Sequence, residues 1–268
     1  MTSSVGPGLP WEEPPEQLTL ARAEIHIWRA WLDQAAPFLD RLESLLSEDE
    51  HRRARRFRFD SHRARFIARR GLLRVILGDY LRVHPARLRF SYGPFGKPTL
   101  SVPSDAGLQF NASHSDTLAL YAVARDCLVG VDVERARTIP QAEGVVAQFL
   151  SPRETVEWLS LPRREQPQAF LRYWTRGEAG VKASGGSIAA ALALRRSRAA
   201  TAGWDQVPPF WEGGASAEAW DFVPAPGYIA CLVCGPRRTP VMGALPDDGR
   251  SFCVADGSDS VRVSALPM

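Results

Sequence analysis

The chain has 268 residues, of which 45% are hydrophobic and 24% are charged, and its formal net charge is +3. This composition is typical of a folded globular protein and excludes wholesale disorder, and no run reaches the roughly 18 apolar residues that a membrane-spanning helix needs. The length allows one large domain or two smaller ones, each with its own core.

The N-terminal segment "MTSSVGPGLPWEEPPEQ" is rich in proline and acidic residues. A secretion signal has a basic region followed by an apolar one, and this segment has neither. We therefore expect a flexible tail over residues 1–17, a cytoplasmic location and no association with membranes.

The next residues predict a strand followed by helices. Residues 23–32 alternate between apolar and polar side chains, which is typical of a strand, and residues 36–46 have helical spacing. Ser47 is a candidate N-cap for a helix over residues 47–59, because three acidic residues follow it and arginines come later. A longer helix is predicted from Asp60 to about Val83, with one apolar face and arginines on the opposite face.

The middle of the chain is predicted to form strands. The stretch "RLRFSYGPFGKP" predicts a short strand that runs into a turn rich in glycine and proline. Residues 108–115, 117–124 and 128–135 are predicted strands, and we expect the last two to form a hairpin through Arg125 and Asp126.

Helices and strands then recur in the same order. Helices are predicted over residues 140–149, 151–160 and 165–184, the second of them with Ser151 as N-cap and Pro152 at its first position. Strands are predicted around "AWDFVPA" and "GYIACLVCG". The repeated order predicts an α+β fold of two similar halves that pack together. We divide the chain into a tail (1–17), an N-terminal α+β half (18–130), a C-terminal α+β half (131–240) and a C-terminal extension (241–268).

Cys231 and Cys234 are the only closely spaced cysteines. Residues three apart on a strand point to opposite faces, so this pair does not favour a zinc site. We expect buried free thiols.

Asp132 and Glu134 are two residues apart in an apolar strand, so both carboxylates project from the same face. For an isolated pair, a solvated face is the commoner explanation. The functional alternative is a Mg²⁺ site, because this ion prefers one or two carboxylates together with substrate phosphates.

Glu178 and Lys182 are four residues apart on a predicted helix, which is also the spacing of an ordinary surface ion pair. However, Lys97 and Lys182 are the only lysines among 33 Lys and Arg residues. A compact ammonium contacts a phosphate oxygen as a point charge, which an arginine fork does not do, so the retained lysines indicate a site.

Two further segments are candidates for binding anions. Ser113 and His114 are expected in a loop after a strand, where they could bind an anion or simply form a polar turn. Ten arginines lie between Arg52 and Arg74, opposed only by Asp60. This excess of positive charge suits a nucleic acid, an acidic protein or solvent.

Four motifs in register resemble the 4′-phosphopantetheinyl transferases of the large type that activates peptide and polyketide synthetases, the surfactin-synthetase-activating (Sfp) type. They are "GKP" at 96–98, "FNASHS" at 110–115, "GVDVE" at 130–134 and "WTRGEAGVK" at 174–182. The resemblance runs from about Leu46 to Lys182. It implies a pseudo-twofold monomer with the active site between its halves, coenzyme A as substrate, and Mg²⁺, with Mn²⁺ as a substitute.

The resemblance also implies roles for individual residues. The predicted metal ligands are Asp132, Glu134 and Glu178, and Glu178 is also the candidate general base. Lys182 is expected to contact the pyrophosphate of coenzyme A. The residues expected to hold the phosphates of its nucleotide are Arg63, Lys97, Ser113 and His114.

The partner implied by the resemblance is an apo acyl or peptidyl carrier protein. The arginine-rich helices would then steer an acidic carrier to the enzyme. The family usually has lysine before the glutamate, where this chain has Gly177, and Arg176 is the neighbouring cation that could compensate. The alternatives are a non-catalytic family member that binds coenzyme A and a basic protein that binds nucleic acid.

Overall fold

The computed structural model describes residues 11, 18–22, 24–103, 107–137, 142–189, 191–192, 217–235, 252–253 and 260–265. Most of the predicted tail (1–17) and much of the predicted extension (241–268) lie outside these ranges. In the part of the chain that is described, no helix combines the length and the apolar character needed to cross a membrane.

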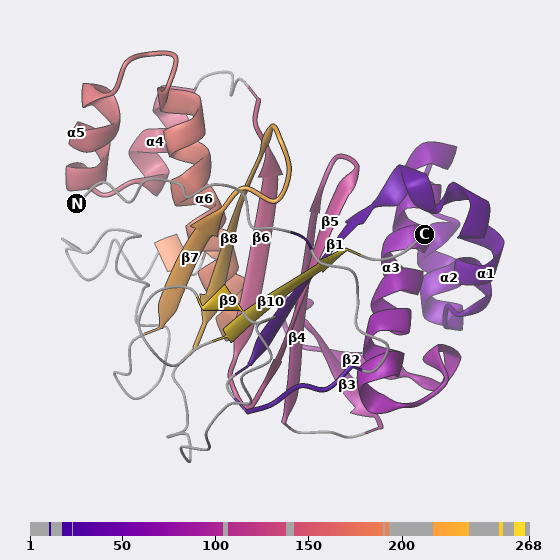
Figure 1. The fold of residues 1–268 in the computed structure, drawn as a ribbon. Helices are drawn as coiled ribbons and strands as arrows, with labels where there is room; N and C mark the ends of the chain where they lie inside the picture. Colours follow the sequence, from indigo (N-terminus) through magenta and orange to yellow (C-terminus); the bar gives the residue numbers. More distant parts are fainter. Residues whose placement is uncertain are drawn as a thin grey trace.

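The N-terminal part of the fold contains a long helix, α3, which lies along one face of a sheet (Figure 1). Its elements are β1 (Ile25–Trp31), the 3-10 helix η1 (Leu32–Phe38), α1 (Leu39–Ser44), α2 (Glu48–Ala54), α3 (Asp60–Leu81), η2 (Pro85–Arg87), β2 (Arg89–Tyr92), β3 (Pro98–Val102), β4 (Leu108–Ser115) and β5 (Leu118–Arg125). In the sequence the long helix comes after β1 and before β4 and β5.

The C-terminal part repeats this plan with α6 as its long helix. Its elements are β6 (Val129–Arg135), α4 (Ala142–Phe149), α5 (Pro152–Ser160), α6 (Gln166–Ser184), β7 (Glu218–Phe222), β8 (Tyr228–Cys234), β9 (Phe252–Cys253) and β10 (Ser260–Ala265).

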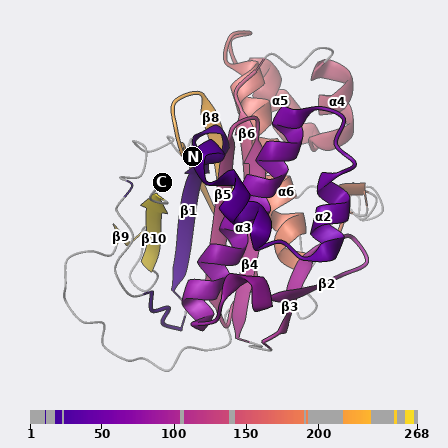
Figure 2. The same ribbon diagram turned by 90° about the vertical axis from the view of Figure 1, so that its right-hand side faces the viewer.

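The two parts have matching strand topologies. The first sheet has the order β4-β5-β1-β10-β9 and the second has the order β6-β8-β7, while β2 and β3 form a separate pair. In the first sheet β5 lies between β1 and β4, and in the second sheet β8 lies between β6 and β7; all four of these pairs are antiparallel. The predicted α+β fold of two similar halves is therefore confirmed. Figure 2 shows β10, from the predicted extension, alongside β1, with which it pairs in parallel.

The predicted hairpin between residues 117–124 and 128–135 is wrong. β5 uses one edge for β4 and the other for β1, so no edge is left for β6. β6 instead enters the second sheet and pairs with β8, and the tight hairpin of this region is formed by β4 and β5. A further strand, β3, was not predicted.

The sheets pack face to face, with helices on their outer faces (Figure 1). Alternate residues of β5 show this arrangement, since Tyr121 and Val123 belong to the core with α3, whereas Leu120 and Ala122 belong to the core with β6 and β8. On the outer face of the second sheet, Cys231 and Val233 pack with α6. Cys231 and Cys234 are buried thiols that form no disulfide within the described residues, as predicted.

Both capping predictions are confirmed. Ser47 begins α2 and Ser151 begins α5, each as part of a capping box with the glutamate three residues later. In α2 this glutamate is Glu50, whose side chain is only 2% exposed.

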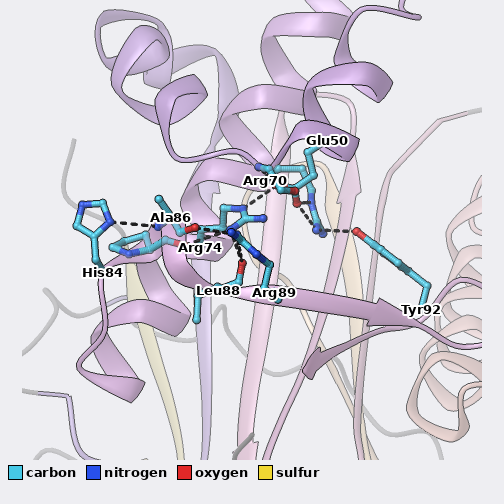
Figure 3. Close-up of polar contacts among 10 residues, drawn as sticks. Glu50, Arg70, Arg74, His84, Ala86, Leu88, Arg89 and Tyr92 are labelled. Carbon is cyan, nitrogen blue, oxygen red and sulfur yellow. Dashed lines mark hydrogen bonds and ion pairs between the residues drawn. The ribbon is translucent and has the colours of Figure 1, made fainter. Parts of the chain in front are cut away.

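Glu50 is the centre of a buried ionic network that joins α2, α3 and η2 (Figure 3). Arg74 Nε donates to Glu50 Oε2 at 2.7 Å, and its Nη1 donates to the carbonyls of Pro85 and Leu88. Arg70 Nε donates to the other carboxylate oxygen at 2.6 Å. Burial alone would raise the pKa of Glu50, but Arg70, the Ser47 N–H and Arg74 hold it below its usual value.

This network corrects the prediction that the arginines of α3 occupy its solvated face. Arg74 is completely buried. A buried arginine is tolerated here because its Nε donates to a carboxylate, its Nη1 donates to two carbonyl groups, and its guanidinium lies over the ring of Phe90.

We predict that Arg74→Met lowers the free energy of unfolding by about 3–5 kcal/mol, because it leaves the buried Glu50 carboxylate with one cation fewer. Urea unfolding measures this change. The matched control is Arg55→Met, since Arg55 forms an exposed ion pair with Glu48, and the expected loss there is at most about 1 kcal/mol. Equal losses in both variants would contradict a special role for the network.

Candidate active site

The candidate site depends on a close approach between α6 and β6. A Cβ atom on Gly130 would lie 2.1 Å from the Ala179 carbonyl oxygen and 2.4 Å from the Ala183 nitrogen. Only glycine leaves room for the helix backbone at this point. As a result, the face of β6 that bears Asp132 and Glu134 lies directly against the face of α6 that bears Lys182.

The edges of the two sheets meet where β4 lies beside β6, and side chains of β4 connect them. The backbone N–H groups of β6 donate to the Asn111 carbonyl oxygen at 2.9 Å, to Ser113 Oγ at 3.4 Å and to Ser115 Oγ at 3.0 Å. These three residues alternate along β4, so they share one face. The motif "FNASHS" is therefore part of β4, as predicted for residues 108–115, and the expectation that placed Ser113 and His114 in a loop after the strand is wrong. Three of its polar residues hold β6 in register.

Asp132, Ser113 and Lys182 form the buried centre of the site. Ser113 Oγ donates to Asp132 Oδ1 at 2.8 Å, and Lys182 Nζ contacts both Asp132 Oδ1 and, at 3.0 Å, Ser113 Oγ. Asp132 is only 4% exposed, and its second oxygen, Oδ2, is buried with no hydrogen-bond partner among the described residues. A buried carboxylate oxygen in this state indicates that a cation or a donor is missing.

Glu134 and Glu178 add two more carboxylates to this centre. Ser115 Oγ donates to Glu134 Oε2 at 2.9 Å. Burial raises the pKa of Asp132, Glu134 and Glu178, and repulsion from Asp132 raises it further for the two glutamates. Mutual repulsion among oxygen ligands is relieved by a hard divalent cation, so this donor set fits Mg²⁺.

The carboxylates do not form a complete metal site by themselves. Within the described ranges, no group of three or more His, Cys, Asp and Glu side chains is arranged to hold a metal ion. Mg²⁺ usually takes one or two protein carboxylates and completes its shell with water and phosphate, so the orphaned Oδ2 of Asp132 still fits this ion.

A positively charged cavity of about 740 Å³ adjoins this centre, at the ends of β4 and β6 and beside α3. Of the residues that line it, all within the described ranges, Asp116 alone is acidic. Ser115 belongs both to the cavity and to the contact with Glu134. The basic residues that line the cavity are His62, Arg65, Arg69, His114, Arg135 and Arg137.

Arg69 is the strongest indication that the cavity takes an anion. Among the described residues, its buried Nε has no hydrogen-bond partner and its guanidinium makes no ion pair; the guanidinium contacts His114 and the ring of Phe66. Burial lowers the pKa of this guanidinium to about 10. A buried cation without a counter-ion is costly, and a bound anion would offset that cost.

His114 faces the same cavity as a neutral imidazole. Desolvation and the charges of Arg69, Lys182 and Arg65 lower its pKa to about 4. Because arginine can only donate, the contact of 3.3 Å between Arg69 Nη1 and His114 Nδ1 places the imidazole proton on Nε2. This N–H is available to donate to a ligand.

The structure thus brings together Asp132, Glu134, Glu178, Lys182 and Ser113, and places His114 in the adjoining cavity. It does not bring Arg63 or Lys97 into that cavity. Arg63 pairs with Glu43 at 3.3 Å, and Lys97 Nζ donates to the Ala183 carbonyl at 2.8 Å.

Arg176 does not compensate for the missing lysine at position 177. Its Nε donates to both oxygens of Asp221 on β7, at 2.8 and 2.9 Å. Gly177 itself is buried.

Sequence reasoning did not place five basic cavity residues in the site: His62, Arg65, Arg69, Arg135 and Arg137. The first three could have been found, because they recur at helical spacing on one face of α3. Arg135 and Arg137 carry no such signal, since their position depends on how β6 ends beside β4.

Comparisons with known proteins agree with this arrangement. The sequence model of the 4′-phosphopantetheinyl transferase superfamily matches residues 128–233, and that of the 4′-phosphopantetheinyl transferase N-terminal region matches residues 29–126.

Three relatives illustrate the range of similarity. The 4′-phosphopantetheinyl transferase HetI of Nostoc sp. is 45% identical over 67% of this chain and 76% of its own length. AcpT of Salmonella typhimurium, also named a 4′-phosphopantetheinyl transferase, is 38% identical over 42% of this chain and 57% of its own length. The 4′-phosphopantetheinyl transferase Sfp of Bacillus subtilis is 26% identical over 57% of this chain and 66% of its own length.

We predict that the pKa of His114, followed by NMR titration of its imidazole, is about 4 and rises by up to about one unit in Arg69→Gln, because one neighbouring positive charge is removed. Arg58→Gln, which changes an exposed arginine outside the cavity, should leave the titration unchanged. A His114 that titrates at the ordinary value of about 6.5 in the wild type would contradict the cavity electrostatics.

Proposed function

This chain belongs to the 4′-phosphopantetheinyl transferase superfamily, and on that premise we propose that it moves the phosphopantetheine arm of coenzyme A onto a serine of an apo acyl or peptidyl carrier protein. The second product is 3′,5′-adenosine bisphosphate. The observation that carries the proposal is Asp132 Oδ2, a buried oxygen with no hydrogen-bond partner among the described residues. Lys182 contacts the other oxygen of the same carboxylate, and Ser115 links this centre to the arginine-lined cavity.

We place the nucleotide of coenzyme A in the arginine cavity. Its volume and its excess of arginine suit a ligand with several phosphates. Arg69 supplies a half-buried charge without a carboxylate partner among the described residues, and His114 supplies a neutral N–H donor. Arg65 is more constrained, since it already pairs with Asp33 and Asp116.

Of the three predicted ligands, Asp132 would hold Mg²⁺, or Mn²⁺ in its place, through Oδ2, and Glu134 or Glu178 would supply the second of the one or two carboxylates that this ion usually takes. When bound, the metal would supply positive charge to the phosphate oxygens on which negative charge develops. Asp132 is already oriented for this, because Ser113 and Lys182 hold Oδ1 and leave Oδ2 uncontacted.

Lys182 has a second task in this proposal. Its ammonium has three N–H donors, and two of them are accounted for by Asp132 and Ser113. The third can reach a pyrophosphate oxygen, so that the same lysine orients the carboxylate and the substrate. A fixed positive charge at this point stabilises the transition state more than the ground state.

The reaction forms one bond and breaks one. The carrier serine oxygen forms a bond to the β-phosphorus of coenzyme A, and the bond from that phosphorus to the bridging oxygen breaks. The bridging oxygen leaves with the adenosine bisphosphate. The serine proton passes to Glu178, whose pKa is raised by burial and by the neighbouring carboxylates.

The carrier protein is proposed to dock beside the cavity on the connection between α2 and α3. This connection exposes Arg55, Arg56 and Arg58 next to the exposed rings of Phe57 and Phe59, and Phe57 also lines the cavity. Such a surface suits a partner with acidic and apolar residues, and it increases the rate of encounter more than the affinity. A monomer would be sufficient, because both halves of the site come from one chain.

The direct test is incubation with coenzyme A, Mg²⁺ and several apo carrier proteins, followed by intact-protein mass spectrometry. We expect a carrier to gain the mass of one phosphopantetheine arm, and EDTA to prevent the gain until Mg²⁺ is restored. Asp132→Asn and Lys182→Met should each lower the turnover about 100-fold or more, since each removes charge from the reacting phosphates.

Asp40→Asn is the matched control, because Asp40 is an exposed acid of α1, and it should keep the wild-type turnover. Absence of a mass gain on every carrier, with coenzyme A still bound, would instead support a non-catalytic member of the family. Binding to nucleic acid that weakens steeply with salt and ignores Asp132→Asn would support the other alternative.

A further inference from the structure

Lys97 is half-buried, yet it lies away from the arginine cavity and makes no ion pair in the part of the chain that is described. Its Nζ donates to the Ala183 carbonyl oxygen at 2.8 Å and lies 3.4 Å from the Val129 carbonyl oxygen. Ala183 is in the last turn of α6, and Val129 begins β6. The ammonium therefore joins the two elements that form the candidate active site.

Helix chemistry explains why a lysine is suited to this position. The last carbonyl groups of an α-helix have no partner within the helix, and the negative end of the helix dipole favours a cation there. The other contacts recorded at this end serve the Val181 carbonyl, which accepts from Gly186 N–H and Ser184 Oγ at 3.0 and 2.9 Å. Lys97 supplies a donor for the Ala183 carbonyl, two residues after Val181.

β2, which leads into the turn that carries Lys97, is held against α3, and Figure 3 shows its residue Tyr92 beside Arg70. Arg70 Nη2 donates to the Tyr92 hydroxyl at 3.1 Å, and the guanidinium groups of Arg70 and Arg74 lie over the ring of Phe90 at 5.0 and 5.2 Å. Both arginines are fixed by the buried Glu50 carboxylate. Contacts thus run from Glu50 to Phe90 and Tyr92 of β2, and directly after β2 the Gly93 N–H donates to the Lys97 carbonyl oxygen at 3.0 Å.

At its other end this chain of contacts reaches Lys182. Ala183, whose carbonyl accepts from Lys97, directly follows Lys182. It is also one of the two residues whose backbone lies against Gly130. A small displacement of this turn would change where Lys182 meets Asp132 and Ser113.

We propose that Lys97 is a positioning residue, which holds the C-terminal turn of α6 against β6 and so fixes Lys182 beside Asp132. This differs from the role in phosphate binding that the resemblance implied for it. Burial supports the proposal, since it lowers the pKa of Lys97 to about 8 and so marks a lysine enclosed by protein. The part of the proposal that concerns turnover rests on the proposed transferase function; the part that concerns the helix does not.

Hydrogen–deuterium exchange of the full chain without coenzyme A tests the contact. In Lys97→Met, peptides covering residues 177–186 should exchange about tenfold faster than in the wild type, while peptides of α3 keep their rates. Lys97→Arg should restore protection, because it returns a cation and a donor. Arg87→Met, which changes an exposed cation of η2, should behave like the wild type.

Steady-state kinetics then separate positioning from phosphate binding. We expect Lys97→Met to lower kcat about tenfold and to change the KM for coenzyme A less than threefold. Unchanged exchange over residues 177–186 would overturn the proposal, and so would faster exchange spread evenly over the whole chain. If the wild type transfers no phosphopantetheine, the proposed function fails, but the exchange result still decides whether Lys97 holds α6.

Discussion

The close approach of α6 to β6 at Gly130 is the constraint on which the rest of the site depends. With no side chain at this residue, the helix backbone comes near enough for Lys182 to reach Asp132 and Ser113. Any larger residue would push against backbone atoms of Ala179 and Ala183, which cannot move aside as a flexible side chain can. The glycine of the "GVDVE" motif is therefore as necessary to the site as the two acids that follow it.

A second contact, between β4 and β6, turns two sheets into one site. Asn111, Ser113 and Ser115 accept hydrogen bonds from β6 where a neighbouring strand would otherwise offer its carbonyl groups. The same serines donate to Asp132 and Glu134. Ser113 and Ser115 thus both join the halves and orient the carboxylates. The anion cavity lies where the contact between β4 and β6 ends.

Local features could be predicted from the sequence because they depend on local chemistry. The helix predicted over residues 165–184 is observed at Gln166–Ser184, and Ser47 and Ser151 both begin helices with capping boxes. The site residues on β6 and α6 were recognised from motifs, and the structure brings them together. Pairing between distant segments was less predictable. β6 pairs with β8 and not with β5, because both edges of β5 are already occupied by β4 and β1, and β1 is far away in the sequence.

Individual side chains were hardest to place where burial reverses their usual behaviour. Arg74 looks like a solvated residue of an arginine-rich helix, yet Glu50 draws it into the core. Lys97 looks like a phosphate ligand, yet its contacts are with backbone carbonyls of the other half.

The dependence of the site on the close approach of α6 to β6 is tested by the turnover of folded Gly130→Ala. The control is folded Gly144→Ala, where an added Cβ meets nothing within 4 Å. For Gly130→Ala alone we predict that turnover, corrected for the fraction folded, falls about 100-fold or more. Wild-type turnover in folded Gly130→Ala would contradict the dependence of the site on this close approach.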